Sequence, residues 1–154
     1  MIRIELLDWD RARAEAGAIR KAVFVDEQGV PEELELDQQD ALSVHALARS
    51  ETGRAIGTGR LLPVEWMDRH AIGHIGRMAV IASWRGRGVG GALLERLVAA
   101  AAERGDSEVA LSAQSHAIGF YRAHGFVVEG GEYLEAGIPH QAMRRVLHPL
   151  RSNS

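Results

Sequence analysis

Hydrophobic and polar residues alternate at the start of the chain and then follow a helical period. Ile2, Ile4 and Leu6 alternate with polar residues, which predicts a first strand. Asp8 or Asp10 can then cap a helix. Its apolar positions recur every three or four residues, at Ala12, Ala16, Ile19 and Val23. The chain therefore begins with a strand followed by an amphipathic helix.

The rest of the chain continues to mix strands and helices. Further strands are predicted over residues 44–49, 54–62, 74–80, 109–113, 126–129, 133–135 and 141–147. A long helix with one apolar stripe covers residues 89–101 and ends at Gly105, and a shorter helix covers residues 117–124. Segments 24–31 and 63–73 are predicted as loops, and the acid-rich segment 32–40 as irregular or short helical. This order predicts one α/β domain over residues 1–154 with a mixed sheet.

Composition excludes several classes of protein. The 154 residues are 46% hydrophobic and 25% charged, the ordinary balance of a globular protein. A net charge of −3 makes a nucleic acid or an anionic membrane a poor partner, and the absence of cysteine excludes disulfides and thiolate chemistry. No apolar run approaches the roughly 18–20 residues that span a bilayer, and the first residues do not resemble a signal peptide. We therefore expect a soluble, cytoplasmic protein.

A glycine-rich turn between a strand and the long helix carries the clearest chemical signal. Glycines at 86, 88, 90 and 91 let a ligand approach the backbone, and the free amides of a helix start attract an anion such as a pyrophosphate. Arg85 and Arg87 add charged donors. A P-loop is excluded because the only lysine, Lys21, lies far away. The turn formally matches a dinucleotide fingerprint, but no acidic residue ends the next strand, which disfavours a nucleotide-dependent oxidoreductase.

Two motifs make the chain recognisable. Arg85-Gly86-Arg87-Gly88-Val89-Gly90 matches the [Gln/Arg]-x-x-Gly-x-[Gly/Ala] signature of the GNAT superfamily of N-acetyltransferases. The segment from Gln114 to Tyr121, followed by His124-Gly125-Phe126, resembles a second motif of that superfamily, with Gln114 in place of the more usual Asn. Segments 23–28 and 135–140 look like those of a subgroup of small bacterial GNAT proteins. The resemblance implies a central mixed, mostly antiparallel sheet flanked by helices.

The resemblance also implies a reaction and a cosubstrate. Such enzymes transfer an acetyl group from acetyl-CoA directly to a primary amine, here of a small molecule or a protein. Carried over residue by residue, the pyrophosphate would be held by Arg85, Gly86, Arg87, Gly88, Val89, Gly90 and Gly91. The backbone of Met78, Ala79 and Val80 would pair with the pantetheine arm, with an amide near Met78 or Val80 stabilising the oxyanion. Gln114 would bond the pantetheine amide.

Candidate acid and base residues follow from the same resemblance. Tyr121 could protonate the departing thiolate, although its ring could also be a core aromatic. His74 starts the strand that leads to Met78, where some members place a base. Glu27 could serve as the base or line the amine pocket, and His140 or Glu135 could bind the amine. Each of these residues also has a structural reading, in loop capping, turn stabilisation or solvation.

Other features leave alternatives open. The acidic run Glu32, Glu33, Glu35, Asp37 and Asp40 could attract a cationic amine or form a solvated loop. His70 and His74 would stand too far apart on a strand to share an ion, so no metal site is expected. An acyl-CoA-binding sensor without turnover is the alternative to an enzyme. The resemblance leaves a homodimer open, because dimers are frequent in the superfamily.

Overall fold

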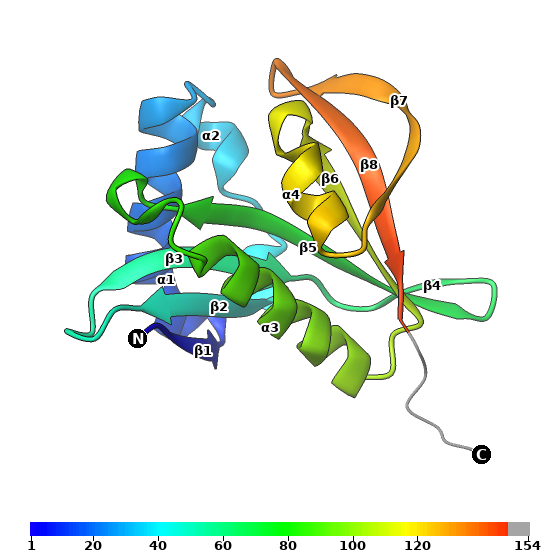
Figure 1. The fold of residues 1–154 in the computed structure, drawn as a ribbon, viewed down its shortest axis with the longest axis horizontal. Helices are drawn as coiled ribbons and strands as arrows, with labels where there is room; N and C mark the ends of the chain where they lie inside the picture. Colours follow the sequence, from blue (N-terminus) through cyan, green and yellow to red (C-terminus); the bar gives the residue numbers. More distant parts are fainter. Residues whose placement is uncertain (148–154) are drawn as a thin grey trace.

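A computed structural model describes residues 1–147 of the chain as a twisted sheet with helices on both faces (Figure 1). The strands are β1 (Arg3–Leu7), β2 (Val44–Arg49), β3 (Ala55–Leu61), β4 (Glu65–Met67), β5 (His70–Val80), β6 (Glu108–Gln114), β7 (Val127–Glu135) and β8 (Ile138–Val146). Their order is β1-β2-β3-β5-β6-β8-β7, with β4 paired to β5. Among the strands of residues 1–147, only β5 and β6 run parallel to each other, so the mixed, mostly antiparallel sheet is confirmed.

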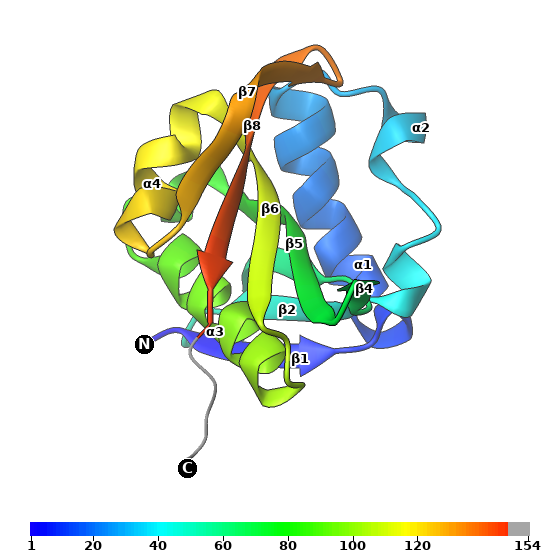
Figure 2. The same ribbon diagram turned by 90° about the vertical axis from the view of Figure 1, so that its right-hand side faces the viewer.

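Helices lie on both faces of the sheet. The α-helices are α1 (Trp9–Arg20), α2 (Glu32–Glu35), α3 (Val89–Glu103) and α4 (Ile118–Ala123). A π-helix, η1 (Lys21–Glu27), continues α1, and single 3-10 turns occur at η2 (Asp40–Leu42), η3 (Ala82–Trp84) and η4 (Ser115–Ala117). Helices α1 and α3 lie on opposite faces of the sheet (Figures 1 and 2). Asp8 caps α1 by accepting a hydrogen bond from the Arg11 amide, which confirms one of the two predicted caps.

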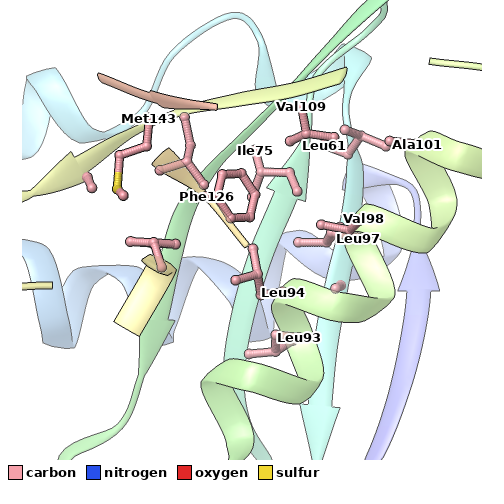
Figure 3. Packing of buried hydrophobic residues seen from close by; sticks show 14 of the residues in the cluster. Leu61, Ile75, Leu93, Leu94, Leu97, Val98, Ala101, Val109, Phe126 and Met143 are labelled. Carbon is pink, nitrogen blue, oxygen red and sulfur yellow. The ribbon is translucent and has the colours of Figure 1, made fainter. Parts of the chain in front are cut away.

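The apolar stripe of α3 builds the larger core. Leu93, Leu94, Leu97 and Val98 point from the helix onto the sheet, where they meet residues such as Phe126 (Figure 3). A smaller cluster lies under α1 on the other face and consists of Ala12, Ala16, Ile19, Val23, Leu47 and Ala79. The apolar stripes of α1 and α3 both recur with a helical period in the sequence. The residues that these two helices bury are therefore the ones that the sequence pattern predicts.

Three segments differ from the sequence-based predictions. Residues 63–73 contain β4 and the start of β5 rather than a loop, because the chain reverses at Asp68 (φ +56°) and pairs back on itself. The segment after α1 remains helical to Glu27 and stops before Gly29, whose φ of +73° cannot continue a helix. The two strands predicted at 126–129 and 133–135 form one strand, β7, with a register shift between Glu129 and Tyr133.

A buried network of ion pairs fixes the acidic segment against the sheet. Arg20 on α1 donates from Nε to Glu35 Oε2 at 2.7 Å and from Nη1 to Asp40 Oδ1 at 2.7 Å. Arg60 on β3 donates from Nη1 to Asp37 Oδ1 at 2.7 Å and to Asp40 Oδ1 at 2.8 Å. Glu35, Asp37 and Asp40 are therefore paired with arginines. They neither form a solvated loop nor remain available to attract a cationic amine, so both sequence-based interpretations are wrong for these three residues.

This network predicts a pH-dependent contribution of Asp37 to stability. The hydrogen bonds from Arg60 lower the pKa of Asp37 from 3.8 to about 2. A carboxyl whose pKa is lower in the folded state stabilises the fold above its unfolded pKa and loses that contribution as the pH falls through the folded pKa. We expect Asp37→Asn to lower the free energy of unfolding by about 1 kcal/mol at neutral pH, since Asp37 is partly exposed and solvent screens its ion pairs.

Urea unfolding of both proteins between neutral pH and about pH 3 measures this difference. The gap should narrow steadily below about pH 4, because Asp37 of the unfolded wild-type chain then takes up a proton that the folded protein binds only near its lower pKa of about 2. The exposed Glu33, replaced by Gln, is the matched control and should show no such gap. A pH-independent difference between wild type and Asp37→Asn would contradict the ion-pair account.

Candidate active site

The sheet opens between its two parallel strands. β5 pairs with β6 only over Ile72–His74, opposite Glu108–Ala110. Beyond that point β5 continues to Val80 and β6 to Gln114 without pairing with each other. The other edge of β5 stays paired with β3 as far as Val80. The gap between these strands, called the wedge below, therefore presents an unpaired edge of β5 to a ligand.

A β-bulge lies on β5 just beyond the point of separation. Arg60 pairs with Gly76 and Thr58 with Ala79, so that Arg77 and Met78 together oppose Gly59. Arg77 has a φ of +52°, a conformation that a bulge of this kind requires. Its guanidinium donates to the backbone oxygen of Glu35 at 2.9 Å. The acidic segment thus holds the bulge, and through it the direction of β5 along the wedge.

The glycine-rich turn lies at the end of β5 and starts α3. Gly86 and Gly88 have φ of +77° and +82°, which explains the glycines at these two positions. Gly88 is the N-cap of α3 and offers no side-chain hydrogen bond, so the amides of the first turn stay available to a ligand. A pocket of about 300 Å³ opens here, lined by Val80, Trp84, Arg85, Gly86, Gly88, Val89, Gly90, Gly91 and Phe120. A helix N-terminus with accessible amides suits a phosphate.

The two arginines of the turn are held in different ways. Arg85 donates from Nε to the backbone oxygen of Val80 at 2.9 Å, and its Nη2 lies 2.8 Å from Glu27 Oε1. The Arg87 guanidinium lies over the Trp84 ring, 4.8 Å from its centroid. Arg85 therefore lines the pocket with its guanidinium paired to the Glu27 carboxylate, and Arg87 lies over Trp84, another lining residue.

Tyr121 projects from α4 toward the core under α3. The residue is 9% exposed, and its ring packs against Phe120 and Phe126 at centroid distances of 5.0 and 6.0 Å. Burial raises the pKa of Tyr121 to about 12, so the phenol keeps its proton at neutral pH. Among the hydrogen bonds of residues 1–147, its hydroxyl takes part in none. Tyr121 is therefore both the core aromatic and a neutral donor with an uncommitted hydroxyl.

Gln114 ends β6 on the opposite side of the wedge from the glycine-rich turn. Its Nε2 donates to Gln28 Oε1 at 2.8 Å, and Gln28 Nε2 donates back to Gln114 Oε1 at 3.3 Å. This reciprocal amide pair links the end of η1 to the end of β6. The sequence motif predicts that Gln114 bonds the pantetheine amide, and it predicts no role for Gln28.

The face of the sheet opposite α3 carries the remaining candidates. A Cβ on Gly73 would meet Ala101 of α3, so His74, the next residue of β5, points to the other face. His74 lies where β5 and β6 part, and its Nε2 is 2.8 Å from Glu65 Oε1. A histidine oriented by a carboxylate in this way is suited to accept a proton. Glu65 comes from β4, which the sequence-based prediction placed in a loop.

His140 lies on the same face at the far side of the wedge. It is the cross-strand neighbour of Gln114 on β8 and is buried, with Nδ1 2.7 Å from the Ile138 backbone oxygen. Because a carbonyl can only accept, Nδ1 carries the proton, and Nε2 faces Glu135 Oε2 at 3.7 Å. Tyr133 stacks on the His140 ring and contacts Ser112 through its hydroxyl. These residues form a polar wall with carboxylate and imidazole groups.

The structure thus gathers most of the sequence-based candidates around the wedge. Tyr121 and the glycine-rich turn lie on the face of the sheet that α3 covers. His74, Gln114 and His140 lie on the opposite face. Gln28, Arg77 and Glu65 were missed because nothing local distinguishes them. Residues 1–147 contain no helix long and apolar enough to cross a membrane. Within the same range, no three His, Asp or Glu side chains form a group that could hold a metal ion.

Comparison with known sequences identifies a family. The family model described as an acetyltransferase (GNAT) domain matches residues 12–147. The uncharacterised N-acetyltransferase YjcF of Bacillus subtilis is 38% identical over 128 residues, which is 82% of this chain and 87% of that protein. A Mycobacterium tuberculosis protein of the UPF0039 group, Rv2851c, is 38% identical over 141 residues, or 88% of this chain and 85% of that one.

Solved structures share the fold of this chain. An acyl-CoA N-acyltransferase from Pseudomonas aeruginosa has a TM-score of 0.81 at 31% identity, covering 95% of this chain and all of that one (100%). ElaA from Escherichia coli also has a TM-score of 0.81, at 29% identity, covering 94% of this chain and 99% of that one. With its family match, its relatives and its opened sheet, the chain belongs to the GNAT acetyltransferase family.

Proposed function

We propose that this protein transfers an acetyl group from acetyl-CoA directly to a primary amine of a small molecule or a protein. The observation that carries the proposal is the wedge, where β5 and β6 part beyond His74 beside the free helix start of α3. An unpaired strand edge can pair with an extended amide-containing arm, and a helix start can bind its phosphates. Acetyl-CoA has both groups on one molecule, with its thioester at the end of the arm.

In this proposal the glycine-rich turn binds the pyrophosphate. The amides of residues 87–91 and the side chains of Arg85 and Arg87 supply the donors. Met78, Ala79 and Val80 pair their backbone with the pantetheine arm, and Gln114 bonds one of its amides. A backbone amide near Met78 or Val80 then stabilises the oxyanion that forms when the amine attacks.

The reaction moves protons on both sides of the wedge. The amine nitrogen attacks the thioester carbon, the new C–N bond forms, and the C–S bond breaks to release the CoA thiolate. Tyr121 donates its hydroxyl proton toward that sulfur as the general acid. Its raised pKa supports a hydroxyl that stays protonated at neutral pH until the thiolate forms.

The amine must lose a proton before or during its attack. His74, oriented by Glu65, acts as the base on the face opposite α3. Glu27 and His140 bind the amine, and Glu135 lies next to His140. The carboxylates of Glu27 and Glu135 favour an acceptor that arrives as a cation.

Gly90→Glu tests the cofactor site. Gly90 lines the pocket, and a Cβ there makes only ordinary contacts, the nearest at 3.5 Å from Phe120 Cζ. A carboxylate in the first turn also suits the helix dipole, so the fold should persist. Calorimetric titration should show that the variant binds acetyl-CoA at least about a hundredfold more weakly, because the new charge lies beside the pyrophosphate.

Wild-type protein should bind acetyl-CoA and not NADPH in the same titration. Gly17→Glu, another helical glycine with open space around its Cβ, is the control and should bind normally. Unchanged acetyl-CoA affinity in a folded Gly90→Glu protein would refute this placement of the pyrophosphate.

Tyr121→Phe tests the general acid, and CoA release by the wild type in the same assay separates an enzyme from a sensor. The ring and its packing remain, so acetyl-CoA affinity and thermal stability should change little. With any amine that the wild type acetylates, we expect kcat to fall at least about a hundredfold, as is typical for a lost general acid. Steady-state rates of CoA release measure this, and an unchanged kcat would remove Tyr121 from the mechanism.

His74→Gln tests the base. At neutral pH we expect kcat/KM for the amine to fall about a hundredfold. The defect should shrink at higher pH, where more of the amine is already deprotonated and needs no base. The exposed His70, replaced by Gln on the same strand, is the control and should behave as wild type. A defect of equal size at every pH would instead indicate a structural role for His74.

A further inference from the structure

Two consecutive residues at the end of η1 contact both sides of the wedge. Glu27 lies 2.8 Å from Arg85 Nη2 on the side of the glycine-rich turn. Gln28 exchanges hydrogen bonds with Gln114 at the end of β6, at 2.8 and 3.3 Å. A single short segment therefore bridges the place where the cosubstrate of the proposed reaction would lie.

Each contact matches the chemistry of the group that it replaces. Arg85 is a proposed phosphate donor, and its present partner is a carboxylate, which is also an oxyanion. Gln114 is the proposed partner of a pantetheine amide, and its present partner is the amide of Gln28. The protein thus satisfies both cofactor-binding side chains with groups of the same type as those that acetyl-CoA would bring.

The backbone of η1 is suited to such a temporary contact. A π-helix is a rare conformation and often marks a functional segment. Here it spans Lys21–Glu27 at the end of a regular helix, and Gly29 with φ +73° ends it one residue after Gln28. Glu27 and Arg85 are both partly exposed, with side chains 39% and 45% accessible, so neither is locked in the core.

We propose that Glu27 and Gln28 compete with the pyrophosphate and the pantetheine amide of acetyl-CoA for Arg85 and Gln114. The inference rests on the proposed function. When acetyl-CoA binds, Arg85 exchanges the Glu27 carboxylate for a phosphate, and Gln114 exchanges the Gln28 amide for the pantetheine amide. No covalent bond changes. The exchange releases a carboxylate and an amide on the side of the wedge where the amine is proposed to bind.

Removing the competing carboxylate should therefore strengthen acetyl-CoA binding. An exposed ion pair of this type commonly changes an equilibrium by about two- to fivefold. We expect Glu27→Gln to bind acetyl-CoA about two- to fivefold more tightly than wild type in calorimetric titration. Glu33→Gln removes the same charge from an exposed carboxylate that pairs with no arginine of residues 1–147, and it should leave the affinity unchanged.

A double-mutant cycle assigns the effect to the Glu27–Arg85 contact. In an Arg85→Ala background, Glu27→Gln should no longer tighten acetyl-CoA binding, because the competing contact is already gone. Equal tightening in both backgrounds, or equal tightening by Glu33→Gln, would overturn the inference in favour of a general effect of charge.

Gln28→Ala tests the amide contact separately. Freed of its partner, Gln114 should accept the pantetheine arm more readily, and acetyl-CoA should bind about twofold or more tightly. The exposed Gln38, replaced by Ala, is the control. Both η1 variants should meanwhile raise the KM for the amine, since the released groups are proposed to face it.

The outcomes separate this inference from the function on which it rests. Acetyl-CoA binding by wild type, with weaker or unchanged binding by Glu27→Gln and Gln28→Ala, would overturn the inference alone. Failure of the folded wild type to bind acetyl-CoA would overturn the proposed function and the inference with it. Thermal melting of each variant checks that the fold is retained.

Discussion

The separation of β5 from β6 is the constraint around which the rest of the molecule is arranged. Backbone amides and carbonyls at a strand edge need partners, and a gap inside a sheet leaves them without any. The chain maintains such a gap beyond His74, with β3 paired on one side and β8 on the other. A ligand with its own amides can complete the interrupted pairing. The helix start of α3 follows the end of β5, so the proposed phosphate donors lie next to this open edge.

Charges buried on the face of the sheet opposite α3 hold the bulge of β5 beside the gap. Arg77 sits in the left-handed region at the bulge of β5, and its guanidinium is held by the acidic segment through Glu35. That segment is fixed in turn by Arg20 and Arg60, which are almost fully buried. Breaking one partner of a buried pair leaves the other charge without compensation, so the network is a costly element to disturb. The end of η1 contacts both sides of the wedge, with Glu27 at Arg85 and Gln28 at Gln114.

Much of this architecture was predictable, and for a local reason. The stripes of α1 and α3 and the alternation of most strands record which side of each element faces the core. The glycine-rich turn was equally readable, because a close backbone approach and a positive φ at Gly86 and Gly88 require glycine. Strand β4 and the continuity of β7 could not be predicted from the sequence. Their residues are largely exposed, so no alternation marks them, and pairing with an already anchored neighbour decides their conformation.

The sequence by itself therefore determined the class of fold, the helices α1, α3 and α4, the glycine-rich turn and the family. Tertiary structure decided how the side chains are partnered. Nothing near Asp37 or Asp40 in the chain shows that they meet Arg60, and nothing near Gln28 shows that it meets Gln114, 86 residues away. Likewise, only the pairing of β6 with β8 sets His140 beside Gln114. Hydrophobic patterns and turn chemistry act between neighbours in sequence, whereas ion pairs and amide pairs depend on distances that exist only once the sheet has formed.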